Sequence, residues 1–111
     1  MDPDIPSFMI ADVVMSTAGR DAGALYYVIE ADESWLMLVN GKDRSLDKPK
    51  RKKCKHTKMV LRSDTRVAEK LRIGDKVLNS ELRRDLAYLG REMQSNALGG
   101  KQLGKRRRNR D

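Results

Sequence analysis

Four short apolar runs and a short return strand, all within residues 12–62 of this 111-residue chain, restrict its fold more than any other feature of the sequence. Each run is rich in the β-branched and apolar residues that favour strands, and turn residues separate the runs. The runs are residues 12–16, 25–29, 35–39 and 57–62, and Leu46 marks the short return strand. Five strands at this spacing, joined by tight turns, predict a mainly β fold with a small closed barrel.

The pair Asn40-Gly41 is the strongest hairpin signal in the sequence. A type I′ turn needs positive φ at both central residues, and asparagine followed by glycine meets that need best. We therefore predict a tight hairpin here, which leads directly into the return strand at Leu46.

Helical periodicity replaces the strand pattern from Ser63 onward. Ser63 or Asp64 is predicted to cap a short helix that Gly74 ends, and Asn79 is predicted to cap a second helix with Glu81 in its first turn. Five apolar residues of the second helix share one stripe: Leu78, Leu82, Leu86, Leu89 and Met93. Because the strands are apolar on both faces, we expect the stripe to cover the sheet. A partner protein is the alternative occupant.

The chain divides into four segments by composition. Residues 1–11 form a short acidic leader, 12–62 the barrel, 63–98 a helical segment packed on it, and 99–111 a basic tail whose few apolar side chains predict disorder. No apolar stretch approaches the roughly 20 residues that cross a bilayer, and the leader lacks the basic start of a secretory signal. These features predict one domain in the cytoplasm without a membrane partner.

Positive charge is concentrated in two blocks. Residues 1–47 carry 3 basic and 9 acidic side chains, whereas residues 48–58 carry 7 basic side chains and no acidic one, and residues 99–111 carry 6 against 1. Mutual repulsion within such a block is costly unless a polyanion is present. The net charge of +8 therefore indicates a nucleic-acid partner.

The segment from Val13 to Gly23 resembles the KOW motif, in which a strand runs into a Gly-basic-Asp-x-Gly turn and a second strand follows. The matching residues are Gly19, Arg20, Asp21 and Gly23. Glycine tolerates positive φ, and the aspartate is expected to accept hydrogen bonds from nearby backbone N–H groups of the turn. The order that follows, residues 27–29, then 35–41, then a basic run closing on Lys55-His56, is similar to the fourteenth-e-like KOW proteins of the large ribosomal subunit and their bacterial relatives.

This resemblance implies an SH3-like barrel that binds structured RNA, with ribosomal RNA and ribosomal proteins as the expected partners. KOW turns usually carry a basic residue on each side of the second glycine, where this chain has Ala22 and Ala24. We therefore assign most of the affinity to the basic block, through phosphate contacts and shape more than base identity. The predicted RNA-contacting residues are Arg20, Lys42, Arg44, Lys48, Lys50, Arg51, Lys52, Lys53, Lys55, His56 and Lys58.

Residue patterns typical of catalysis are missing from the sequence, which has no Gly-Lys-Ser phosphate loop, no Gly-x-Ser-x-Gly elbow and no metal-ligand spacing. Cys54 and His56 are the single residues of their kinds. Cys54 is expected to be a small apolar side chain in a strand, in a reducing compartment. We predict no enzymatic activity, no catalytic or metal-binding residue, no cofactor and no small-molecule substrate.

Two questions stay open at this point. Trp35, Tyr26 and Tyr27 form either a stacking surface for bases or part of the core, and we expect two of the three in the core. The alternative function is a protein-interaction module that docks on a ribosome-bound or transcription factor through the barrel edge or the C-terminal helix. The dependence of binding affinity on salt concentration distinguishes the two functions, because RNA binding weakens steeply with salt and apolar docking does not.

Overall fold

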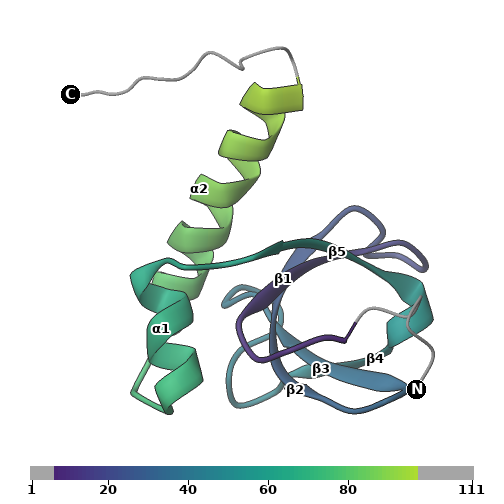
Figure 1. Ribbon diagram of the computed structural model, residues 1–111, viewed down its shortest axis with the longest axis horizontal. Coiled ribbons are helices and arrows are strands. Elements are labelled where there is room, and N and C mark those ends of the chain that lie inside the picture. The colour runs from purple at the N-terminus through teal and green to yellow at the C-terminus, as the bar shows by residue number, and fades with distance from the viewer. Residues whose placement is uncertain (1–6, 98–111) are drawn as a thin grey trace.

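The computed structural model describes residues 7–97, which form a five-stranded antiparallel sheet followed by two helices (Figure 1). The strands are β1 Asp12–Ser16, β2 Leu25–Ala31, β3 Trp35–Val39, β4 Lys50–Lys53 and β5 Thr57–Arg62. A 3-10 turn, η1 Cys54–His56, joins β4 to β5, and the helices are α1 Arg66–Ile73 and α2 Asn79–Ala97. The predicted mainly β fold with C-terminal helices is confirmed. The predicted basic tail lies outside the described residues.

Within the described residues, neither helix has the length and apolar character needed to span a bilayer.

The strand order is β4-β3-β2-β1-β5, so β4 and β5 are the two edges of the sheet. Only the three residues of η1 separate these edge strands along the chain. The sheet must therefore curl until its edges approach, which gives the small barrel visible in Figure 1. Register shifts mark irregularities in two strand pairs, at Val13 and Val14 where β1 pairs with β5 and at Val28 to Glu30 where β2 pairs with β3. Irregularities of this kind bend a strand and increase its local twist.

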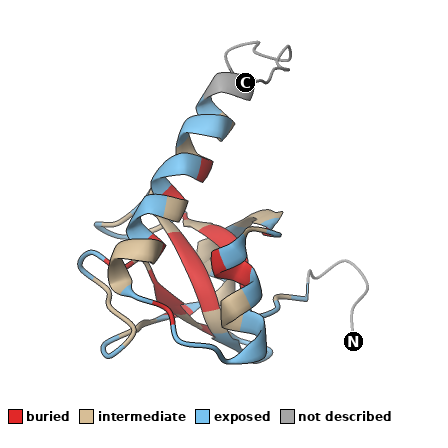
Figure 2. Cartoon of the chain, turned by 90° about the vertical axis from the view of Figure 1, so that its left-hand side faces the viewer, coloured by how far each residue is buried: buried red, intermediate tan, exposed pale blue. Residues whose placement is uncertain are grey.

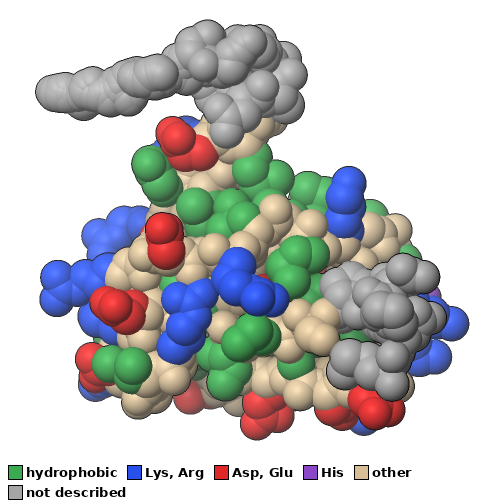
Figure 3. Space-filling view, in the orientation of Figure 1, with side chains coloured by type: hydrophobic (Ala, Val, Ile, Leu, Met, Phe, Trp, Pro, Cys, Tyr) green, Lys and Arg blue, Asp and Glu red, His purple; other side chains and the backbone are tan. Residues whose placement is uncertain are grey.

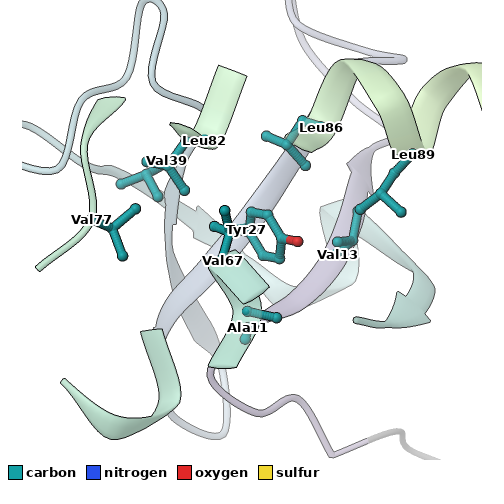
Figure 4. Packing of buried hydrophobic residues seen from close by; sticks show 10 residues of the cluster. Ala11, Val13, Tyr27, Val39, Val67, Val77, Leu82, Leu86 and Leu89 are labelled. Carbon is teal, nitrogen blue, oxygen red and sulfur yellow. The ribbon is translucent and has the colours of Figure 1, made fainter. Parts of the chain in front are cut away.

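Apolar residues are buried on both faces of the curled sheet, because consecutive residues of β1 and β2 are buried (Figure 2). The interior cluster contains Val14, Tyr26, Val28, Leu36 and Leu38. On the outer face, Val13, Tyr27 and Val39 pack against helix residues that include Val67, Leu82, Leu86 and Leu89 (Figure 4). The prediction that the leucine stripe covers the sheet is thus confirmed for these leucines, each worth roughly 1.5–3 kcal/mol of burial. It is wrong for Leu78, which is 52% exposed.

A buried polar cluster ties the helices to the barrel. The Tyr27 hydroxyl donates to the Asp85 carboxylate and lies 2.9 Å from Ser63 Oγ and 3.2 Å from Thr65 Oγ1. Burial, together with the hydrogen bond to Asp85, raises the pKa of Tyr27 to about 12, so the phenol stays protonated at neutral pH. The cluster fixes both helices over the part of the outer face that holds Val13, Tyr27 and Val39. Arg51 and Lys53 of β4 stay exposed.

Both predicted helix caps are displaced along the sequence. Thr65, not Ser63 or Asp64, caps α1, and its Oγ1 accepts from Ala68 N at 3.2 Å. Ser63 is buried beside Tyr27 and its hydroxyl is used there. The left-handed Gly74 ends α1 as predicted.

Asn79 is the first residue of α2, and its Oδ1 accepts from Leu46 N at 3.1 Å. Glu81, in the first turn as predicted, accepts from Leu78 N at 2.9 Å. The start of α2 is therefore capped by Glu81 from within the helix, while Asn79 bonds to the loop between β3 and β4.

The tight hairpin predicted at Asn40-Gly41 is wrong. Gly41 has φ 77°, but Asn40 does not share a positive φ, and the next strand begins only at Lys50. Asn40 Oδ1 accepts from Lys42 N and Arg44 N, while Arg83 donates to Gly41 O at 2.7 Å. The loop therefore docks on α2 instead of turning directly back along β3. The predicted return strand at Leu46 is also wrong, because Leu46 lies in this loop and the strand that pairs with β3 is Lys50–Lys53. The partly buried Leu46 side chain packs against the core shared with the helices.

Candidate nucleic-acid interface

The centre of the basic block is a strand with two different sides. The β4 residues pair with β3 in the register Lys50 with Leu38, Arg51 with Met37, Lys52 with Leu36, and Lys53 with Trp35. Side chains of paired residues lie on the same face of a sheet, and successive residues alternate between faces. Lys50 and Lys52 therefore share the interior face with the buried leucines, whereas Arg51 and Lys53 share the outer face with Trp35.

The inner pair, Lys50 and Lys52, is bound within the protein. Lys52 is only 8% exposed, and its Nζ donates to Asp21 Oδ1 and to Ala18 O, both at 2.9 Å. Lys50 Nζ lies 3.3 Å from Asp21 Oδ2. Both lysines are predicted RNA-contacting residues, but their ammonium groups already neutralise a carboxylate. We therefore leave them out of the candidate interface.

Asp21 is the acceptor around which this part of the barrel is organised. Besides the two lysines, its carboxylate accepts from Ser16 Oγ at 2.8 Å and from the Tyr26 hydroxyl at 2.7 Å. These donors are side chains, where the sequence predicted backbone N–H groups of the turn. Burial by itself raises the pKa of Asp21, but the hydrogen bonds from Tyr26, Lys52, Ser16 and Lys50 outweigh it and hold that pKa well below its usual range. Asp21 is therefore ionised in the folded protein at neutral pH.

Replacing Asp21 by asparagine is expected to lower the free energy of unfolding by about 2–3 kcal/mol at neutral pH, because Lys52 loses its charged acceptor. The folded pKa lies below the unfolded value of about 3.9, so the stabilisation is complete above about pH 4 and is lost as the pH falls below it. The variant should therefore lose less stability than the parent on acidification. Urea unfolding at neutral pH and at about pH 3 measures both effects. The exposed Asp47 gives the matched control, Asp47→Asn. An unchanged acid dependence in Asp21→Asn would contradict this role of Asp21.

The turn that presents Asp21 has the predicted backbone shape. Gly23 has φ 95° and its N–H donates to Ser16 O at 2.8 Å, and Gly19 has φ 86°. Both glycines thus adopt the positive φ that glycine tolerates. Arg20 is exposed in the same turn. The turn therefore acts through its shape, which aims Asp21 at the inner face of β4, and adds one exposed cation.

The outer pair, Arg51 and Lys53, lies over Trp35. Arg51 Cζ is 4.2 Å and Lys53 Nζ is 5.6 Å from the centroid of the indole ring. Such cation–π contacts restrain the cations by only about 0.5–1 kcal/mol at exposed sites. Tyr26 and Tyr27 are 1% and 0% exposed and Trp35 is half-buried, so two of the three aromatic residues are in the core, as expected.

The exposed cations continue along the chain from β4 through η1 into β5. We call Arg51, Lys53, Lys55 and Lys58 the outer basic strip, and all four are exposed. The half-buried His56 lies within this stretch, and blue side chains gather beside the purple histidine at the right of Figure 3, where Figure 1 places η1. The remaining predicted residues, Lys42, Arg44 and Lys48, lie in the loop between β3 and β4 that docks on α2.

Two surface cavities flank Trp35, and both are lined by Phe8 and Trp35. The first has a volume of about 870 Å³ and balanced charges, contributed by Glu30, Asp32, Arg51 and Arg72. The second has a volume of about 980 Å³ and is lined by Lys53, Lys55 and Lys58, with Glu33 as its one carboxylate and with Met59 as a further apolar wall. The sequence did not point to Phe8 or Met59, because only closure of the barrel brings the leader and β5 beside Trp35.

Cys54 lies in η1 and not in a strand as predicted. The thiol is half-buried, and burial followed by the charge of Asp32 raises its pKa, despite the neighbouring lysines. Cys54 is therefore a protonated thiol, which is a poor nucleophile. In the part of the chain that the structure describes, no three His, Cys, Asp or Glu side chains are grouped to hold a metal ion.

Comparison of the chain with protein-family models and with curated proteins gave no significant match.

Proposed function

We propose that this chain is a non-catalytic RNA-binding protein that contacts structured RNA through the outer basic strip. The observation that carries the proposal is the separation of charge in β4, where Asp21 neutralises Lys50 and Lys52 while Arg51 and Lys53 face solvent. Lys55 and Lys58 extend the exposed charge along η1 and β5. Lysine and arginine side chains that neutralise phosphates release condensed counterions, which is the main source of affinity in such interfaces.

The resemblance of residues 13–23 to a KOW turn supports ribosomal RNA as the class of RNA. The turn supports binding in an indirect way, because Asp21 pairs with the inner lysines and so sets which side of β4 faces outward. Arg20 adds a further exposed cation. On this proposal the protein acts in the cytoplasm as a ribosomal or ribosome-associated component, with ribosomal proteins as neighbours.

Docking on a protein through the C-terminal helix has less support. Leu82, Leu86 and Leu89 of the leucine stripe are 0%, 7% and 8% exposed because they cover the barrel. The large apolar residues that remain exposed in the described helical segment are Ile73, Leu78 and Tyr88, at 72%, 52% and 49%, and three side chains are a small apolar area for a specific interface.

Two double variants with the same change of charge test the proposal. Arg51→Gln with Lys53→Gln should weaken RNA binding and lower the slope of log affinity against log salt by about 2, at nearly unchanged stability. Lys50→Gln with Lys52→Gln should lower the melting temperature, because Asp21 loses its cations, and should keep the slope when measured well below the melt. Fluorescence anisotropy of a labelled RNA stem and thermal melts give both readouts. Equal losses of RNA affinity in the two variants would overturn the assignment to the outer face.

A further inference from the structure

The cavity of about 980 Å³ beside Trp35 combines apolar walls with a one-sided charge. Its size is at the upper end of the range for sites that hold small ligands. Phe8, Trp35 and Met59 supply aromatic and thioether surface. The charged residues that line the cavity are three lysines and one glutamate. The cavity on the other side of Trp35 has similar walls but balanced charges. The charges therefore favour an anionic ligand in the cavity of about 980 Å³ and not in the one of about 870 Å³.

A flat apolar group that carries negative charge matches this arrangement. An unpaired nucleotide is such a ligand, because its base stacks on aromatic side chains while its phosphates bind cations. A base inside a duplex does not fit, since both its faces are covered by neighbouring bases and specific RNA recognition therefore targets unpaired positions. We propose that this cavity binds one unpaired nucleotide of the RNA, with the base against Trp35 and Phe8 and the phosphates on Lys53, Lys55 and Lys58. The proposal rests on the RNA-binding function above and names the part of the RNA that reaches the barrel.

The contacts of Trp35 explain how the indole is held for stacking. Arg51 lines only the balanced cavity and lies 4.2 Å from the ring centroid, so it restrains the indole from that side. Lys53 lines only the basic cavity, and its Nζ is farther from the ring, at 5.6 Å. A lysine stem is flexible, so the ammonium group moves from the ring to a phosphate when the base enters.

Trp35 is the only tryptophan of the chain, so its fluorescence reports on this cavity directly. The full chain is titrated with an RNA stem that carries a single-nucleotide bulge and with the same stem without the bulge. The bulged stem should quench the fluorescence to saturation and bind at least about five-fold more tightly, by the usual contribution of one stacked base. The stem without the bulge should bind through the outer basic strip and quench the fluorescence only slightly. Equal quenching and equal affinity for the two stems would overturn the proposal.

Variants of Trp35 make the same test by anisotropy. Trp35→Leu should lose the preference for the bulged stem, Trp35→Phe should retain most of it, and the control Tyr88→Leu, which removes an exposed aromatic residue of α2, should leave it intact. Thermal melts identify any variant that fails to fold. If Trp35→Leu fails to fold, the stem preference of Trp35→Phe and the fluorescence titration of the parent chain test the site instead. A Trp35→Leu protein that keeps the preference would overturn the nucleotide site. If neither stem binds with an affinity that falls with salt, the proposed RNA-binding function itself is refuted.

Discussion

Gly41→Ala is expected to lower the free energy of unfolding by more than about 4 kcal/mol, an exceptionally large effect for one methyl group. A Cβ at this position would lie 2.1 Å from Asn79 O and 2.9 Å from Leu82 Cβ, and the backbone has φ 77°. The backbone carbonyl at the start of α2 cannot move away without releasing the helix. Because Leu82 and Leu86 cover the outer face of the barrel, displacement of α2 would expose the core they share with Val39.

Gly74→Ala is the matched control for Gly41→Ala. Gly74 has φ 75°, close to that of Gly41, but a Cβ there meets nothing within 4 Å. The control should therefore cost only the backbone strain of about 1–2 kcal/mol, and the remaining difference between the variants measures the clash with α2. Chemical denaturation of both variants gives the comparison. Equal stabilities would show that the β3–β4 loop does not pack on α2 as described.

Much of the fold follows from local sequence patterns. The apolar runs at β1, β2, β3 and β5 are visible because each is bounded by turn residues, and Gly74 marks the end of α1. The prediction of a tight hairpin at Asn40-Gly41 was wrong because contacts with α2 override local turn preferences. Gly41 is required for close approach to Asn79, and the sequence gives no sign of a partner 38 positions away.

The candidate site was predicted as a block of charge, and its division into two faces was not. The sequence Lys50-Arg-Lys-Lys53 has no apolar alternation, so the period of two that identifies a strand is hidden. Lys52 is bound by Asp21, which is 31 residues away in the sequence and meets it only once the sheet has curled. The cavity beside Trp35 likewise needs Phe8 and Met59 from distant segments. Long-range pairing of charges and closure of the sheet are the features that a single sequence does not display.

Replacing the whole outer basic strip is expected to have the largest effect on binding. Four phosphate contacts at about 0.9 units each amount to a fall of about 3 to 4 in the slope of log affinity against log salt. The change should leave the fold intact, because Arg51, Lys53, Lys55 and Lys58 are exposed. A control with the same loss of charge replaces Arg66, Lys76, Arg84 and Arg91, which are exposed cations of the helical segment.

The salt dependence of RNA binding, measured for the parent chain and these two fourfold glutamine variants, shows whether the outer basic strip contacts the phosphates. Anisotropy of a labelled, bulged RNA stem over a range of salt concentrations gives the three slopes. We expect a steep slope for the parent, a slope smaller by about 3 to 4 for the variant of the outer basic strip, and a slope close to the parent's for the helical control. A strip variant that keeps the parent's slope and affinity, or a helical control that loses as much, would contradict the claim that this protein binds RNA through the outer basic strip.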